Sequence, residues 1–217
     1  MVALSRVAGE VKRGLVEEMR RSFDRPTPYT LNALRVKPAT RQSMASLVLL
    51  KEFAGKGTPA HKFLSPSVEG GPRRLKRMEK ALQRVGVLPA GRFIVPGWRA
   101  DLDAYGNMSR GQIVKILSYF RAFPEMGYRA NRPRSGEGGS RSRERYMVFT
   151  AGGRLKPVGV YKLVPGSALL LPILKFIPSP DYVPRLDWWG VRERVVETRF
   201  APLFDQALRQ ARATARP

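Results

Sequence analysis

The amino-acid sequence predicts an α+β fold: a small antiparallel sheet packed by long N- and C-terminal helices, with a mostly helical and loop insertion in the middle. Three observations lead to this prediction. Both ends of the chain repeat apolar residues at three- and four-residue steps, which is the period of an amphipathic helix. Residues 145–177 hold three short apolar runs separated by turn signals, as in paired strands. We therefore expect a core built from 1–51 and 145–217, interrupted by an inserted region at 52–144.

Residues 3–23 form the first predicted helix. The proline-rich segment 24–28 ends it, because a residue that precedes proline is pushed out of the helical region. A short extended segment at 30–38 and a strand at 44–51 are predicted to follow, which completes the N-terminal part of the core. The apolar positions of the helix are Leu4, Val7, Ala8, Val11, Leu15, Met19 and Phe23.

The inserted region contains two predicted helices and a short strand. The first helix begins at Pro72, because proline is favoured at the first helical position, and it continues to Val85. Residues 92–96 suit a strand. Ser109 and Gln112 then have the spacing of a capping box, which predicts the start of the second helix.

Residues 126–145 differ in composition from the rest of the chain. They are rich in arginine, glycine, serine and proline and nearly free of aliphatic side chains. Such a segment cannot bury enough apolar surface to become ordered alone. Two interpretations stay open: a solvated loop, or an arginine-rich arm that becomes ordered against DNA or a neighbouring subunit.

The final region reads as strands followed by a long helix. Gly152-Gly153 and Pro165-Gly166 separate the apolar runs, so a small antiparallel meander is the simplest assembly. Asp187 is placed to cap a terminal helix that starts at Trp188 and contains Pro202, where we expect a kink or a junction of two helices. The positions expected to face inward are Val191, Val195, Val196, Phe200, Leu203, Phe204, Ala207, Leu208 and Ala211.

The chain of 217 residues is strongly basic, with 40 Lys and Arg against 17 Asp and Glu and a formal net charge of +23. Hydrophobic residues make up 43% of it, which is enough for a core and excludes a disordered polycation. Self-repulsion of this size is usually relieved by an anionic partner, either nucleic acid or an acidic protein surface. The composition therefore predicts binding to an anionic surface without choosing between the two.

Two sets of residues are candidates for such contacts. Amphipathic aromatic side chains suit a core margin or a subunit interface, and we take Tyr182, Trp188 and Trp189 as candidate interface residues. The candidate partner or DNA contacts are the cations of the first inserted helix and of the arginine-rich segment: Arg73, Arg74, Lys76, Arg77, Lys80, Arg129, Arg132, Arg134, Arg141 and Arg143.

No pattern in the sequence points to catalysis, to a cofactor or to a metal. The chain has no cysteine, which removes thiolate chemistry and cysteine-based zinc sites. His61 is the only histidine and has no acidic or nucleophilic neighbour, and Asp101 with Asp103 lacks the other oxygen ligands of a calcium loop. There is no glycine-rich nucleotide-binding fingerprint. We therefore expect a protein that is not an enzyme and has no cofactor or metal site.

A membrane location is not expected either. No run approaches the roughly 20 apolar residues that a membrane-spanning helix needs. Charged residues recur every few positions through 2–23, so we expect no signal peptide.

The order of these segments resembles the tail-completion and minor tail protein Z family of tailed phages. The resemblance is densest over Val158 to Arg216, where Gly159-Val160-Tyr161 precedes an aliphatic strand, Pro180-Asp181-Tyr182 and a helix rich in Arg, Phe and Ala. The stretch from Phe63-Leu64-Ser65-Pro66 to Tyr105-Gly106-Asn107 is similar to prophage-encoded members of the same kind.

This resemblance implies a virion structural protein at the head–tail junction, with copies arranged in a ring. The implied partners are the portal or connector and the tail tube or tail terminator proteins, with possible contact to packaged DNA. The implied location is the neck or tail of the virion, assembled in the cytoplasm of the bacterial host. A sequence-independent nucleic-acid-binding protein is the alternative, because the charge of +23 and aromatic residues beside basic ones also suit that role.

Overall fold

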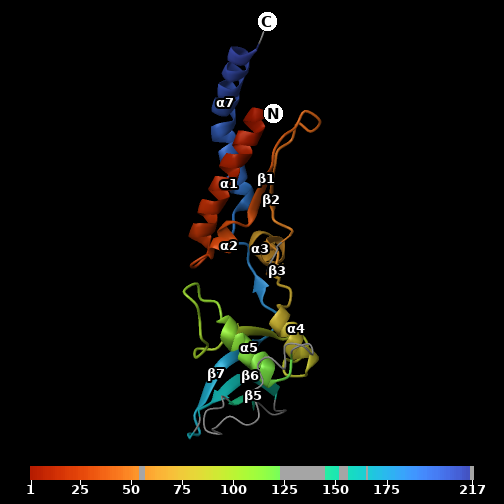
Figure 1. Cartoon of the computed structure of the whole chain (residues 1–217), viewed down its shortest axis with the longest axis vertical. Helices are drawn as coiled ribbons and strands as arrows, with labels where there is room; N and C mark the ends of the chain where they lie inside the picture. Colours follow the sequence, from red (N-terminus) through yellow and green to blue (C-terminus); the bar gives the residue numbers. More distant parts are fainter. Residues whose placement is uncertain (54–56, 123–144, 152–155, 165, 216–217) are drawn as a thin grey trace, which may run out of the picture. The chain divides into compact units, whose positions relative to one another are not determined.

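The computed structural model describes residues 1–53, 57–122, 145–151, 156–164 and 166–215 (Figure 1). The predicted α+β class is confirmed: long terminal helices pack together, and the sheets are small and antiparallel. Contacts divide the chain into two compact units. Unit 1 contains Met1–Gly71 and Asp181–Pro217, and unit 2 contains Pro72–Pro180.

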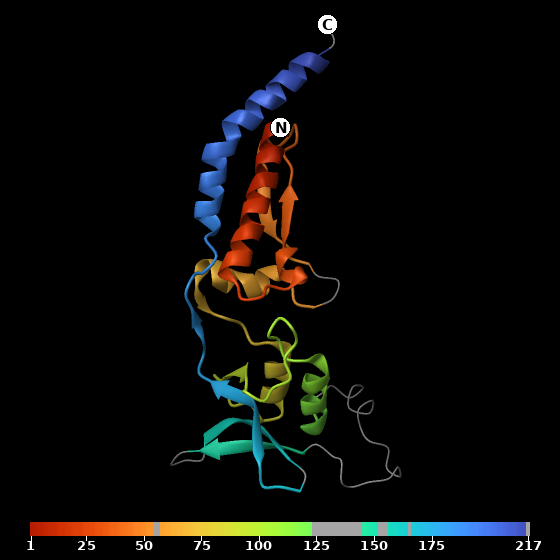
Figure 2. The ribbon, with the colours of Figure 1, turned by 90° about the vertical axis from the view of Figure 1, so that its left-hand side faces the viewer.

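Unit 1 is built around two long helices, α1 (Val2–Ser22) and α7 (Trp188–Thr214). They lie side by side and run in opposite directions (Figure 2). The hairpin of β1 (Leu34–Lys37) and β2 (Leu47–Leu50) lies against α1 on the side away from α7 (Figure 2). The predicted N-terminal helix and the strand predicted at 44–51 are therefore confirmed, and a one-turn helix, α2 (Pro28–Leu31), precedes β1.

The core of unit 1 is the apolar face of α1. Leu15 and Met19 are fully buried, and they belong to one cluster with Leu34 of β1 and Val191 of α7. Gly14 lets the two long helices approach closely, because a Cβ atom there would lie only 3.0 Å from Cγ1 of Val191. The apolar period therefore identified the buried face of α1 correctly, and the structure shows that this face packs against β1 and α7.

The sequence pattern missed two helices of unit 1: the one-turn helix α2, where an extended segment was expected from residue 30, and the longer α3 (Ala60–Glu69). Pro66 lies inside α3, and its presence obscured the helical period in the sequence. Gly70 follows the helix with a φ of 79°, a conformation that favours glycine. Ala60 and Leu64 bury one side of α3 in the core of unit 1, which explains why tertiary packing overrides the proline.

Unit 2 contains a four-stranded antiparallel sheet in the order β4-β7-β6-β5. The predicted meander is confirmed as β5 (Arg145–Ala151), β6 (Lys156–Leu163) and β7 (Leu170–Ile177). The strand predicted at 92–96, β4 (Phe93–Pro96), pairs with β7 and completes the sheet. Two helices, α4 (Arg77–Arg84) and α5 (Arg110–Tyr119), accompany it.

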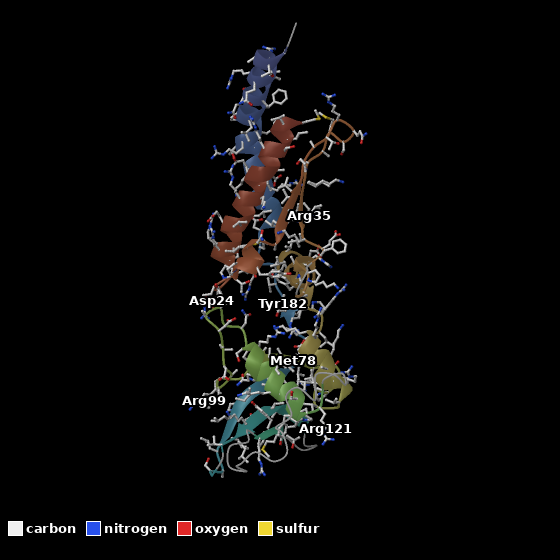
Figure 3. The ribbon with its side chains drawn as sticks, in the orientation of Figure 1. Asp24, Arg35, Met78, Arg99, Arg121 and Tyr182 are labelled. Atoms are coloured by element: carbon white, nitrogen blue, oxygen red, sulfur yellow. The ribbon has the colours of Figure 1, made fainter. Side chains whose placement is uncertain are left out.

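The core of unit 2 lies between these helices and one face of the sheet. Leu82 of α4 and Ile116 of α5 form one buried cluster with Val160, Leu174 and Phe176 of the strands. Met78 of α4, labelled in Figure 3, packs against this cluster. The Ser109 hydroxyl accepts a hydrogen bond from the Gln112 backbone amide (3.2 Å), so the predicted start of α5 is also confirmed.

The two units are joined by short extended segments, β3 (Gly71–Pro72) and β8 (Asp181–Tyr182), which pair with each other. Pro72 therefore belongs to an extended segment, and the prediction that it is the first residue of a helix is wrong. The α4 helix begins five residues later, at Arg77, because the Glu79 carboxylate accepts a hydrogen bond from the Lys76 amide at its N-terminus (2.6 Å).

The boundaries of the units differ from the regions 1–51, 52–144 and 145–217 that composition suggested. Strands β5 to β7 share their core with α4, α5 and β4 and not with the terminal helices. The physical reason is pairing: Phe93 to Pro96 match Ile177 to Leu174 in register, so the central region supplies an edge of the sheet.

The terminal helix is continuous from Trp188 to Thr214, with Pro202 inside it. Its course bends (Figure 2), and this agrees with the expected kink rather than with two separate helices. Asp187 caps it as predicted, since Oδ1 accepts a hydrogen bond from the Gly190 amide (2.9 Å).

Candidate interaction surfaces

The described part of the chain shows no grouping of side chains suited to metal binding. No set of three or more His, Asp or Glu residues within it is placed to hold a metal ion. Asp103 uses Oδ1 to accept hydrogen bonds from the amides of Tyr105 and Asn107 (both 2.9 Å), so it closes a local turn. Among the described helices, none combines the length and apolar character needed to cross a bilayer.

The most buried charged group among the described residues is Glu79, whose relative exposure is 1%. Its carboxylate accepts two hydrogen bonds from the Arg73 guanidinium (2.5 and 2.7 Å). It accepts two more from the backbone amides of Lys76 (2.6 Å) and Ile94 (2.8 Å). Arg73 also lies over the ring of Phe93, 4.8 Å from its centroid. These contacts tie the segment before α4, the start of α4 and strand β4 to one another.

The protonation of Glu79 reflects two opposing effects. Burial raises the pKa of its carboxyl group. The hydrogen bonds from Arg73, Ile94 and Lys76 and the charge of Arg73 outweigh burial, so the pKa lies below its ordinary value. Glu79 is therefore an anion held inside unit 2 for structural reasons, with no feature of a general acid.

The predicted contact residues fall into three groups in the structure. Arg73 is directed inward to Glu79, and its side chain is only 12% exposed. The other cations predicted on or before α4, namely Arg74, Lys76, Arg77 and Lys80, are exposed. The cations predicted in the arginine-rich segment, Arg129, Arg132, Arg134, Arg141 and Arg143, lie outside the described residues.

The predicted aromatic interface residues also differ in environment. Trp188 is half-buried and packs against the core of unit 1. Trp189 is 62% exposed, with the Arg192 guanidinium 5.2 Å from its ring centroid. Tyr182, labelled in Figure 3, is 39% exposed on β8. Trp189 and Tyr182 are therefore the members of this set that are available to a partner.

One face of the sheet in unit 2 is turned away from the core. Side chains alternate along a strand, and Tyr146 and Val160 point into the core, so their neighbours point to the opposite side. Met147 and Phe149 on that side are 43% and 41% exposed. The centroids of the Phe149 and Tyr161 rings lie 5.1 Å apart. We call this surface the open sheet face; its residues are Arg145, Met147, Phe149, Tyr161, Leu163 and Lys175.

A second apolar surface lies on α7 in unit 1. Residues at four-residue steps form a row along this helix, and their exposed fractions are 38–48%. The rings of Phe200 and Phe204 stack, with centroids 5.9 Å apart. We call this row the α7 apolar stripe; its residues are Val196, Phe200, Phe204 and Leu208.

The prediction that these four residues face inward is wrong. Apolar side chains occupy two adjacent rows of α7, and α1 covers only the row that contains Val191, Val195 and Leu203. In addition, α7 has 27 residues and α1 has 21, so α7 extends beyond the start of α1 (Figures 1 and 2). The width of the apolar band, two rows rather than one, was the sequence signal that α1 would not cover all of it.

Carboxylates line the α7 apolar stripe on one side. Three exposed carboxylates lie one position after residues of the helical row that contains the stripe. They are Glu193, which follows Arg192, Glu197, which follows Val196, and Asp205, which follows Phe204. Within the described residues, none of them forms an ion pair. The same border also contains Arg209, one position after Leu208, and Arg192 and Arg212 continue the row of the stripe beyond its two ends.

Comparisons with known proteins add no assignment to these surfaces. No protein-family model, curated protein or solved structure matches the chain.

Proposed function

We propose that this chain is a structural protein of a tailed bacteriophage, a ring-forming neck or tail-completion component that joins the head to the tail. Its role is to bind other proteins, and it carries out no reaction. The partners in this proposal are further copies of the chain, the portal or connector on one side, and the tail tube or tail terminator on the other. Its place is the neck or tail of the virion.

The observation that carries the proposal is an exposed apolar surface on each compact unit. Unit 1 has the α7 apolar stripe and unit 2 has the open sheet face. Contiguous apolar surface bordered by polar residues is typical of a protein–protein contact. A chain with two such surfaces on two units can bind two neighbours at once, which is what a bridging component requires.

Two further features support this role. The order of elements and the segments over Val158 to Arg216 resemble the phage minor tail protein Z family. The side chains of the described buried polar groups, Glu79 and Gln112, are engaged in structural hydrogen bonds. These two buried groups therefore serve to hold the fold together, while the buried Nδ1 of His61 and Oγ of Ser118 have no hydrogen-bond partner among the described residues.

Imaging of the purified protein tests the proposal. The chain, alone and mixed with portal or tail-tube protein, is examined by negative-stain electron microscopy and by light scattering. Closed rings of defined copy number are expected. A protein that stays monomeric in both conditions would contradict the proposed function.

The alternative, a sequence-independent nucleic-acid-binding protein, is favoured by the exposed cations Arg74, Arg77 and Lys80 on and before α4. A salt titration of binding to random-sequence DNA distinguishes the two. Phosphate-driven binding is expected to weaken about tenfold or more between 50 and 200 mM salt. High-affinity binding that follows this salt dependence, in a protein that does not self-associate, would favour the alternative.

A further inference from the structure

We propose that the α7 apolar stripe of one copy docks on the open sheet face of the next copy. This inference rests on the self-assembly in the proposed function and assigns the two surfaces that make the contact. The partner of the stripe is therefore a second copy of this chain. The second copy uses its open sheet face for this contact and keeps its own stripe free for a third copy.

The two surfaces match in chemical character. The stripe is apolar through Val196, Phe200, Phe204 and Leu208, and the open sheet face is apolar through Met147, Phe149, Tyr161 and Leu163. The apolar side chains of both surfaces are half-exposed in the single chain. A contact between the two surfaces would remove this apolar area from water, which is favourable. Helix on sheet is also a standard two-layer packing, and α4 and α5 use only the other face of this sheet.

The charges at the borders of the two surfaces are complementary. Four charged residues lie one position after the row of the stripe: three are carboxylates, Glu193, Glu197 and Asp205, and the fourth is Arg209. The open sheet face carries the cations Arg145 and Lys175, which have no ion pair with the described residues. Glu193 and Glu197 are four positions apart on one helix and repel each other, and a cation of a neighbouring copy beside them would reduce this repulsion. A neighbouring copy supplies that cation together with the apolar surface.

The dimensions of the two surfaces also agree. Twelve residue steps from Val196 to Leu208 span about 18 Å at the helical rise of about 1.5 Å per residue. Strand β5 has seven residues and spans about 20 Å at about 3.4 Å per residue. The stripe thus fits the length of one strand of the sheet.

A contact between two different surfaces has a consequence for assembly. Each copy offers one stripe and one sheet face, so copies add head to tail. Such contacts generate a ring when the rotation closes and a filament when it does not. The same two surfaces therefore give the closed ring of the proposed function without a second kind of self-contact.

Mixing two variants tests this contact. Phe204→Asp damages the stripe and leaves the sheet face intact, and Phe149→Asp damages the sheet face and leaves the stripe intact. Because Phe204 is 48% exposed and Phe149 is 41% exposed, neither change removes a core side chain. The matched control is Tyr105→Asp, which replaces an aromatic residue that is 41% exposed and belongs to neither surface. Circular dichroism verifies that each variant is folded.

The expected masses distinguish the outcomes. Wild type and Tyr105→Asp are expected to form the same oligomer, and each of the two surface variants alone is expected to have the monomer mass of 24.4 kDa. An equimolar mixture of the two is expected to give a complex of twice that mass, because one intact stripe then meets one intact sheet face. If one variant does not fold, Leu208→Asp or Met147→Asp replaces it, since these residues are 40% and 43% exposed.

Three results would overturn the inference, and each is separable from failure of the proposed function. Oligomers of wild-type mass in both variants would show that the contact lies elsewhere. Monomers that are not rescued by mixing would show that the two surfaces do not meet. Full assembly of Phe149→Asp together with loss of any binding to random-sequence DNA shown by the wild type would assign the sheet face to nucleic acid. A monomeric wild type would instead contradict the proposed self-assembly itself.

Discussion

At the residue scale, Glu79 has a structural role that its neighbours in the sequence do not indicate. It lies among cations from Arg73 to Arg84 and has the appearance of an ordinary surface acid. In the fold it is buried and accepts hydrogen bonds from Arg73, Lys76 and Ile94, which come from three separate parts of unit 2. A buried ion pair of this kind contributes little when intact compared with apolar packing, but removal of one partner leaves an uncompensated charge.

Glu79→Gln is expected to lower the free energy of unfolding by about 3 kcal/mol at neutral pH, because Arg73 is left without its carboxylate. In the folded protein the pKa of Glu79 lies below its value of 4.5 in the unfolded chain. The ionised carboxylate therefore stabilises the fold above pH 4.5, and this contribution is lost as the pH falls through the folded pKa. Urea unfolding at pH 7 and at lower pH measures both effects, and the variant is expected to lose less stability in acid than wild type.

The control for this prediction is Glu17→Gln. Glu17 is paired with Arg20 on the surface of α1, and its side chain is 57% exposed. The expected loss is under about 0.5 kcal/mol, as for other exposed pairs. Equal losses in the two variants would contradict the structural role of Glu79.

At the element scale, unit 1 depends on how closely α1 and α7 approach. Gly14 of α1 faces Val191 and Val195 of α7, where an added Cβ would lie 3.0 and 3.4 Å from their side chains. Gly9 lies on the same helix, and a Cβ there would meet no atom within 4 Å. The two glycines thus separate the effect of packing from the effect of helix propensity.

Gly14→Leu is expected to destabilise the protein by about 1–3 kcal/mol, because the larger side chain forces the helices apart. Gly9→Leu is expected to be neutral or stabilising by up to about 1 kcal/mol, because leucine favours the helix more than glycine does. Thermal unfolding followed by circular dichroism measures both. A destabilisation that is equal in the two variants would show that α1 and α7 do not meet closely at Gly14.

At the scale of the whole molecule, the two units have separate cores. The cluster around Leu15 and Met19 belongs to unit 1, and the cluster around Ile116 and Val160 belongs to unit 2. Each core is a contiguous set of buried apolar residues, which is the property of a cooperative unit. We therefore expect local damage to stay within the unit in which it occurs.

Hydrogen exchange with peptide resolution checks this expectation. Glu79→Gln is expected to accelerate amide exchange in α4, α5 and β4 to β7 and to leave α1 and α7 unchanged. Gly14→Leu is expected to accelerate amide exchange in α1 and α7 and to leave α4, α5 and β4 to β7 unchanged. Acceleration throughout the chain in both variants would mean that the protein unfolds as one unit.

Elements whose structure depends on neighbouring residues were predicted correctly, and elements that depend on distant contacts were not. The terminal helices, the strand at 44–51 and the meander of β5 to β7 were predictable, because period, turn residues and caps act over a few neighbouring residues. Helix α3 was not, because Pro66 disturbs the local pattern and burial of Leu64 compensates for it. The pairing of β4 with β7 was also beyond reach, since it joins residues about 80 positions apart.

The same division holds for the interaction surfaces. The sequence by itself determined the fold class, the strong positive charge and the exposed cations of α4, because composition and local period are sufficient for these. Only the tertiary structure decided that Arg73 serves Glu79, that Phe200 and Phe204 stay exposed, and that one side of the sheet is left open. Those properties depend on which apolar row a distant helix covers and on which charge a distant strand brings close. Contacts of that kind are set by the packing of segments far apart in the chain, and no local pattern contains them.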